Sequence, residues 1–250
     1  MTNLSGRVAV VTGSARGIGK AIAERYGSLG ASVVVNFSNN EKAALDTAAS
    51  IERSGGKAVA IRADVSKVAD IERLFAASLE KFGRLDIAVA NAGVELAEHP
   101  LIAGVSEETF DRVFAINAKG AFFTLQCAGK HVVDNGRIIY VGSSTTGYPM
   151  PGLGVYGGSK IAAQYFVEVL AKELGPRGVT VNSILPTATE GAGIFGQGVD
   201  ASYRDAVKSY RPMARMGSVR DVADAAEYFA SDLSSFVSGQ HLLLSGGANR

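Results

Sequence analysis

The sequence predicts an α/β protein with one doubly wound parallel sheet of about seven strands and helices on both faces. Two observations indicate this fold class. Short runs rich in Val, Ile and Ala, typical of strands buried on both faces of a parallel sheet, recur along the chain. Helical patterns alternate with them, and no linker or repeat divides the 250 residues. We therefore expect a single domain over residues 1–250.

The expected strands begin with Arg7–Thr12, which runs into a glycine-rich turn. The helix after this turn carries Ile18, Ile22, Tyr26 and Leu29 on one side, and Gly30 ends it. The remaining strands are expected at Ser32–Asn36, Lys57–Ala63, Asp86–Ala90, Arg137–Val141, Val179–Ile184 and Gln240–Leu244.

Further helices are expected in the intervals between these strands. Ser66 is expected to cap the third helix, which carries Val68, Ile71, Phe75 and Phe82. Ser106 precedes two glutamates that suit a helix start, and that helix is expected to extend through Asn117 to His131. The others are expected at 41–53, 155–174 and 219–229.

Residues 191–210 interrupt this alternation and are rich in glycine at their start. Two interpretations stay open for them. They form either a mobile segment that covers the active site or an ordinary surface loop.

Composition excludes several classes of partner. The net charge of +1 gives no reason to expect nucleic acid or an acidic membrane as a partner. His99, His131 and His241 match no metal-ligand spacing, and no stretch reads as a membrane span or a signal peptide. The single cysteine, Cys127, fits a reducing compartment, so we expect a cytoplasmic protein without a metal.

The turn after the first strand has the features of a phosphate site. Gly13, Gly17 and Gly19 lie between an expected strand and an expected helix, in the sequence Gly13-Ser14-Ala15-Arg16-Gly17-Ile18-Gly19. Glycine lets the backbone approach a ligand closely, and the start of a helix offers free N–H groups to a pyrophosphate. The pattern differs in spacing from GxGxxG, but its setting predicts dinucleotide binding.

The end of the second strand favours NADP(H) over NAD(H). Sites selective for NAD place Asp or Glu there, whereas residues 36–39 are Asn36, Phe37, Ser38 and Asn39. A 2′-phosphate would meet no acid before Glu41, and Arg16 is within reach of it. Asp64, at the end of the third strand, either accepts a hydrogen bond from the adenine amino group or forms part of a helix start with Ser66.

Residues 142–160 hold the candidates for catalysis. Ser143 follows an apolar strand, and Tyr156 and Lys160 are four residues apart, on one face of the expected helix. A lysine cation near a phenol lowers the pKa of the phenol, so Tyr156 is expected to exchange a proton near neutral pH. Ser143 beside it would hold an alcohol or carbonyl oxygen. The alternative is that each of these residues is structural.

Together these stretches resemble the short-chain dehydrogenase/reductase family over essentially the whole chain. The resemblance rests on the glycine turn, Asp64-Val65, Asn91-Ala92-Gly93, Asn117, and Ser143 thirteen residues before Tyr156, all in the family's order. It implies a Rossmann-type fold that binds NADP(H). The implied cofactor-binding residues are Gly13, Ser14, Arg16, Gly17, Ile18, Gly19, Asn36, Ser38, Asp64, Val65, Asn91, Ala92, Gly93, Tyr156, Lys160, Pro186, Thr187 and Thr189.

The resemblance also implies a catalytic tetrad of Asn117, Ser143, Tyr156 and Lys160 that reduces a ketone or oxidises an alcohol. Tyr156 would donate the proton, Ser143 and Tyr156 would hold the substrate oxygen, and Lys160 would also bind the nicotinamide ribose. Asn117 would anchor a water in a proton relay. The family usually shows Pro-Gly where this chain has Pro186-Thr187, and a threonine where it has Gly191, which puts the contacts to the nicotinamide in doubt.

Other functions stay open. The leading one is an NADPH-dependent carbonyl reductase, with a 3-oxoacyl-carrier-protein reductase of fatty acid synthesis as the alternative. A catalytically silent NADP-binding regulatory protein belongs to another class, and a serine hydrolase is disfavoured because no GxSxG motif is present. Residues 161–170 are apolar nearly all round, which indicates either a homodimer or homotetramer interface, as the resemblance also implies, or burial beneath residues 191–210.

Overall fold

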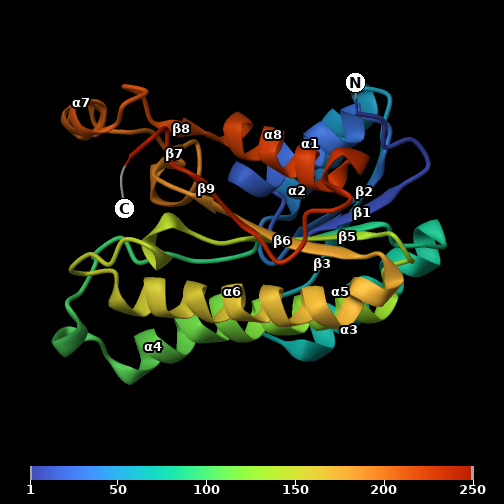
Figure 1. Cartoon of the computed structure of the whole chain (residues 1–250), viewed down its shortest axis with the longest axis horizontal. Helices are drawn as coiled ribbons and strands as arrows, with labels where there is room; N and C mark the ends of the chain where they lie inside the picture. Colours follow the sequence, from blue (N-terminus) through green and yellow to red (C-terminus); the bar gives the residue numbers. More distant parts are fainter. Residues whose placement is uncertain (1, 249–250) are drawn as a thin grey trace.

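A computed structural model describes residues 2–248, which form one main parallel sheet with helices packed on both of its faces (Figure 1). Its seven strands lie in the order β3-β2-β1-β4-β5-β6-β9. They are β1 (Val8–Val11), β2 (Ser32–Phe37), β3 (Lys57–Arg62), β4 (Ile87–Ala90), β5 (Arg137–Val141), β6 (Thr180–Pro186) and β9 (His241–Leu244). Every pair in this sheet is parallel, so the expected fold class is confirmed.

Helices cover both faces of the sheet, as Figure 1 shows. On one face lie α1 (Gly17–Ser28), α2 (Glu41–Arg53) and α8 (Val219–Ala230). On the other lie α3 (Val68–Phe82), α5 (Ala121–His131) and α6 (Gly154–Leu174), with α4 (Glu107–Phe114) beside them. Alternate strand residues serve the two apolar cores: Ala9 and Val11 contact the first layer, and Val10 contacts the second. This is why the strands read as continuous apolar runs.

Strand order reverses between β1 and β4, because the chain goes outward through β2 and β3 and then returns to the other side of β1. In an open α/β sheet the crevice at the carboxyl ends of such neighbouring strands is the usual ligand site. The glycine turn follows β1, and Asn91 follows β4. The topology therefore places both segments at one crevice.

The helix expected from Glu107 to His131 is interrupted. Residues Ala115–Gly120 form a π-helical turn between α4 and α5. Such turns occur often at functional sites because the extra residue redirects the neighbouring side chains. Asn117 lies in this turn and is fully buried, whereas a mid-helix asparagine would ordinarily be exposed.

Two other expectations need correction. Ser66 does not cap α3; the cap position is Lys67, without a side-chain hydrogen bond, and Ser66 instead donates from N and Oγ to Asp64 Oδ1, at 3.0 and 2.8 Å. Residues 191–210 are not simply a loop, because they contain the helix α7 (Ala201–Tyr210). A short parallel pair, β7 (Thr189–Glu190) with β8 (Gly217–Ser218), lies directly before and after this part of the chain. The mobility of residues 191–210 stays a prediction.

The outer side of α6 is not buried beneath residues 191–210. Ile161 is 50% exposed and Tyr165 is 66% exposed. Figure 1 shows α7 on the opposite side of the sheet from α6. Within residues 2–248, no helix is both long and apolar enough to cross a bilayer.

Candidate active site

The glycine turn between β1 and α1 has a backbone that requires glycine. Gly13 and Gly17 have φ angles of +63° and +60°, in the left-handed region that side chains rarely adopt. A Cβ on Gly13 would lie 2.9 Å from the Ala92 Cα, and one on Gly19 would lie 2.5 Å from Gly13 O. The turn is thus packed tightly against the end of β4. The start of α1 is left free to offer N–H groups to an anion.

Three of the expected cofactor residues build this turn with their side chains. Asn36 Oδ1 accepts a hydrogen bond from Gly13 N at 2.9 Å, while its Nδ2 donates to Ala63 O at 3.0 Å. Ser14 Oγ donates to Val11 O at 2.6 Å and accepts from Asn36 N at 3.0 Å. Asn91 Nδ2 donates to Thr12 O at 2.8 Å. The side chains of Asn36 and Ser14 are buried and engaged within the protein, and cofactor binding by these two residues stays a prediction.

A polar pocket with a cavity volume of about 250 Å³ opens at the carboxyl ends of β2 and β3. Ser38, Arg62 and Asp64 are among the residues that line it. Arg62 Nε donates to Ser38 O at 3.0 Å, which directs the guanidinium toward the end of β2. Asp64 uses Oδ1 to bind Ser66, so the helix-start interpretation of Asp64 is confirmed for that oxygen. Val65 is buried just after it, against the other apolar core. Arg16 lies in the glycine turn after β1 and has an exposed side chain.

The catalytic candidates meet at the carboxyl end of β5. Ser143 lies two residues beyond β5 and is 6% exposed, and Tyr156 and Lys160 lie in the first two turns of α6. Lys160 Nζ donates to Val141 O at 3.2 Å and lies 6.0 Å from the centroid of the Tyr156 ring. Thr145 Oγ1 donates to Ser143 Oγ at 2.9 Å and fixes the position of that oxygen. The structure therefore brings together the three residues that the sequence singled out.

The expected acidification of Tyr156 is wrong for this structure. Burial raises the pKa of Tyr156 well above 10, the negative charge of Glu95 raises it further, and the neighbouring Ser143 hydroxyl lowers it. Burial also lowers the pKa of Lys160, from 10.5 to about 8, against the opposite influence of Glu95. Both shifts have one cause: the protein interior disfavours the charged form of each group. Tyr156 consequently keeps its proton at neutral pH, while the pKa of Lys160, about 8, lies close to neutral pH.

Asn117 holds the chain just beyond β4. Its Oδ1 accepts from Val94 N at 2.8 Å, and its Nδ2 donates to Val94 O at 2.8 Å and to Ser159 Oγ at 3.0 Å. A Cβ on Gly93 would lie 2.8 Å from Lys160 Nζ and 3.1 Å from Asn117 Oδ1, so a side chain there would displace Lys160. Asn117 thus fixes the backbone that passes over Lys160. Its part in a proton relay stays a prediction.

The residues beyond β6 show a fit to the nicotinamide end of a cofactor. Pro186 ends β6, and Thr187 N donates to Leu244 O at 3.2 Å. Thr187 Oγ1 is buried without a hydrogen-bond partner, whereas Thr189 Oγ1 donates to Thr187 O at 2.7 Å. A buried hydroxyl without a protein partner is available to a ligand or a water molecule, so Thr187 Oγ1 fits a cofactor contact at this position. The Thr189 hydroxyl is already engaged.

Comparison with known proteins agrees with this geometry. The family profile described as Enoyl-(Acyl carrier protein) reductase matches residues 13–249. Elsinochrome reductase 1 of Elsinoe fawcettii is 38% identical, and the match covers 99% of this chain and 96% of that protein. The chain belongs to the short-chain dehydrogenase/reductase family.

Two solved structures of the family are similar throughout. The promiscuous reductase LugOII, which catalyses keto-reduction at C1 during lugdunomycin biosynthesis, has a TM-score of 0.91 at 37% identity and covers 98% of this chain and 99% of its own. A short-chain dehydrogenase of Burkholderia cenocepacia in complex with NADP has a TM-score of 0.92 at 32% identity, with 99% and 100% covered. Members of the family are oxidoreductases that use a nicotinamide cofactor on small molecules, and this chain is one of them.

Sequence reasoning gave no role to three residues near this site. Arg62 is recognisable only as a cation at the end of a strand, two residues before Asp64, and Thr145 carries no signal of its own. Glu95 carries no motif and lies two residues after Gly93. In the structure it is the acid whose charge acts on both Tyr156 and Lys160.

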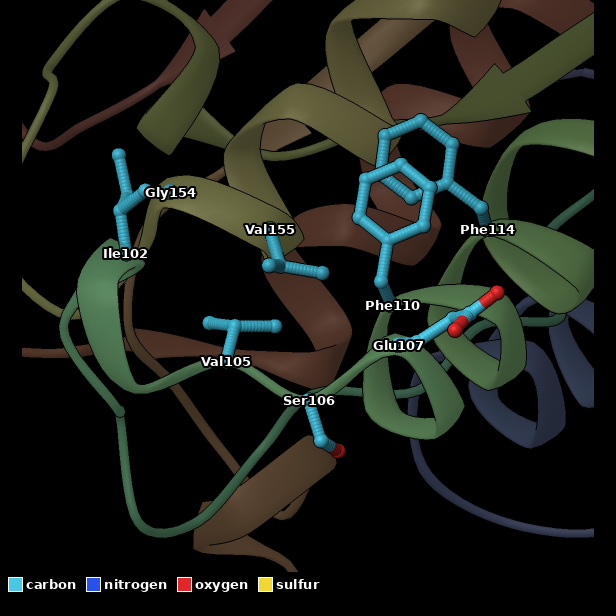
Figure 2. A pocket seen from close by; sticks show the side chains of 8 residues that line it. All are labelled: Ile102, Val105, Ser106, Glu107, Phe110, Phe114, Gly154 and Val155. Atoms are coloured by element: carbon cyan, nitrogen blue, oxygen red, sulfur yellow. The ribbon is translucent and has the colours of Figure 1, made fainter.

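A second recess, of about 470 Å³, is separate from these residues (Figure 2). Figure 2 shows the rings of Phe110 and Phe114 overlapping on one side of it, and their centroids lie 4.1 Å apart. Val155 lines this recess from the start of α6, together with Ile102, Val105, Ser106, Glu107 and Gly154. The recess is mainly apolar and contains none of the catalytic candidates.

Proposed function

We propose that the protein is an NADPH-dependent reductase that transfers hydride to a ketone, with Tyr156 as the general acid. The observation that carries this proposal is the meeting of the Ser143 hydroxyl, the Tyr156 phenol and the buried Lys160 ammonium at the end of β5. Bound in the crevice beside them, NADPH would supply the hydride. The protein's own residues would position the carbonyl and deliver the proton.

The raised pKa of Tyr156 keeps this residue in the protonated form that reduction of a ketone requires. A tyrosine that keeps its proton at neutral pH can donate that proton to a carbonyl oxygen as negative charge develops there. Ser143, held by Thr145, would hydrogen-bond the same oxygen and restrict its position. Lys160, with a pKa of about 8, would then return a proton to Tyr156. Such general acid catalysis contributes about 10²- to 10⁴-fold.

The preference for NADP(H) is supported by charge at the end of β2. No acid follows β2 before Glu41, Arg62 lines the pocket at that position, and Arg16 is an exposed cation in the glycine turn after β1. A guanidinium binds phosphate through paired hydrogen bonds. The related Burkholderia cenocepacia protein was solved with NADP.

We also infer that the protein assembles through α5 and α6. Phe122, Ile161, Tyr165 and Val169 are between 37% and 66% exposed on these two helices. Large apolar side chains grouped on one surface favour a protein partner. Light scattering should report a dimer or a larger species at micromolar concentration, and a monomer would contradict this assembly.

The function is tested by following oxidation of NADPH or NADH against a panel of aliphatic, cyclic and aromatic ketones and a 3-oxoacyl thioester. Tyr156→Phe removes only the phenol oxygen, so it should reduce turnover by at least about 100-fold while NADPH binding changes little. Binding is measured separately by fluorescence of the bound cofactor. Unchanged turnover in the variant would remove Tyr156 from the mechanism, and preference for the thioester would identify the carrier-protein alternative.

A further inference from the structure

We propose that Glu95 and His99 together recognise a hydroxyl group of the substrate, so that the enzyme prefers ketones carrying a hydroxyl away from the carbonyl. This recognition rests on the proposed function as a ketone reductase and names its substrate class. Four observations support it. The backbone before Glu95 is fixed, the charge of Glu95 acts on Tyr156 and Lys160, residues 191–210 cover Glu95, and Nε2 of His99 is available to a ligand.

Glu95 is held in place by its neighbour in the chain. Asn117 binds both the N–H and the carbonyl of Val94, each at 2.8 Å, so the backbone that leads into Glu95 is fixed. Gly93, one residue earlier, lies against Lys160 Nζ. The carboxylate thus starts from a rigid point directly beside the catalytic lysine.

The carboxylate of Glu95 acts electrostatically on Tyr156 and Lys160. Burial raises the pKa of Glu95, and its neighbours His99 and Lys160 lower it. Burial is the larger effect on both catalytic residues: it raises the pKa of Tyr156 and lowers the pKa of Lys160. The negative charge of Glu95 raises both pKa values. The Glu95 side chain is only 23% exposed. Its carboxylate is therefore close enough to Tyr156 and Lys160 for its charge to act on both.

Residues 191–210 cover the other side of Glu95. A Cβ added to Gly193 would lie 3.7 Å from Glu95 Oε2. Burial raises the pKa of Tyr203 on α7, and Glu95 is among the charges that add to this shift. Phe195 packs on Tyr203 with ring centroids 5.0 Å apart, so this part of the segment is ordered above the carboxylate. In this proposal a ketone bound at Tyr156 lies beneath this cover, beside Glu95.

His99 supplies the second polar atom. Its Nε2 lies 3.4 Å from Glu95 Oε1 in an ion-pair contact, and no other described residue binds this nitrogen. The backbone of His99 has a φ of +44°, in the left-handed region that histidine adopts more often than most residues, and its carbonyl packs closely on Gly152. The Nε2 atom is therefore available to a ligand that approaches Glu95.

A hydroxyl is the group that satisfies both atoms. An ionised Glu95 only accepts hydrogen bonds, and His99 donates one in the tautomer that carries its proton on Nε2. A hydroxyl donates one hydrogen bond and accepts another, so a single substrate oxygen would pair with both side chains. A carboxylate on the substrate would be repelled by Glu95, and an ammonium group could not accept from His99.

The test compares 1-tetralone with its isomers that carry a phenol on the aromatic ring. For each enzyme the readout is the ratio of kcat/KM for the hydroxylated ketone to kcat/KM for the parent ketone. Both substrates use the same Tyr156 and Lys160, so any effect of a variant on those residues cancels in the ratio. The variants are Glu95→Leu, Glu95→Gln and His99→Phe, with Glu98→Gln as the matched control on an exposed carboxylate in the same loop.

We expect the wild-type enzyme to prefer at least one hydroxylated isomer by about 10-fold or more. Glu95→Leu should lower that ratio by about 10- to 100-fold, the factor that a hydrogen bond to a charged group is worth. Glu95→Gln should have a smaller effect in the same direction, because an amide oxygen still accepts. Glu98→Gln should leave the ratio unchanged, and thermal melting of each variant shows that it is folded.

Reduction of the parent ketone without any preference by the wild-type enzyme would overturn this recognition and leave the reductase intact. An unchanged ratio in Glu95→Leu would overturn it equally. If His99→Phe does not fold, the Glu95 variants still decide the question. Failure to reduce any ketone in the wider panel would instead overturn the proposed function itself.

Discussion

Replacing Gly19 by alanine tests the packing that holds the glycine turn against β4. The new Cβ would lie 2.5 Å from both Asn91 Nδ2 and Gly13 O, and 2.9 Å from the Ser14 Cα. Ordinary contacts between carbon atoms lie at about 3.5–4.0 Å, so the turn and Asn91 would have to separate by about 1 Å. Two of the three nearest atoms are backbone atoms, which cannot rotate away.

Overpacking of this kind costs about 1–3 kcal/mol of stability. For a chain of this size, each kcal/mol lowers the melting temperature by about 2–4 °C, so Gly19→Ala should melt about 2–12 °C lower than the wild type. The shift should also break the hydrogen bonds from Asn91 to Thr12 and Gly13, and NADPH binding should weaken with it.

Gly158→Ala is the matched control, because Gly158 also lies inside a helix. Its nearest neighbour would be the Phe114 ring at 3.8 Å, an ordinary contact. Alanine is preferred over glycine inside a helix by about 0.5–1 kcal/mol, so this variant should melt at the same or a slightly higher temperature. Thermal unfolding followed by circular dichroism measures both. A Gly19→Ala protein with wild-type melting and wild-type NADPH affinity would refute close packing of the turn.

Three further predictions follow from charge. Arg16→Ala should weaken NADPH by about 10- to 100-fold and NADH much less, measured by calorimetry; equal weakening of both would refute the phosphate contact. Glu95→Gln removes a negative charge that raises the pKa of Lys160, so the loss of reductase activity with rising pH should begin at a lower pH than in the wild type. Arg215 holds the pKa of Asp221 well below its usual 3.8, so Asp221 stabilises the fold above that pH and less as pH falls. Asp221→Asn should therefore melt lower than the wild type at neutral pH, with a gap that narrows in acid; a gap independent of pH would contradict this.

Much of the architecture could be predicted from the sequence because it depends on local pattern. Apolar runs such as Ser32–Asn36 can be buried on both faces only inside a parallel sheet, and the glycines at 13, 17 and 19 mark a turn that a side chain would block. The spacing of Tyr156 and Lys160 on one helix fixes their shared face. These features require only neighbours along the chain, so the fold class and the shared helix face of Tyr156 and Lys160 could be predicted from them, whereas the strand order came from the structure.

What the tertiary structure decided is the environment of those same residues. Burial from several elements at once reverses the expected pKa shift of Tyr156, and the π-helical turn directs Asn117 inward to hold Val94. The side chains of Asn36 and Ser14 hold the glycine turn through hydrogen bonds. The carboxylate of Glu95 raises the pKa values of Tyr156 and Lys160. Local sequence determines which element a residue joins. Solvent exclusion and hydrogen-bond partners depend on segments that are distant along the chain, and only folding brings them together.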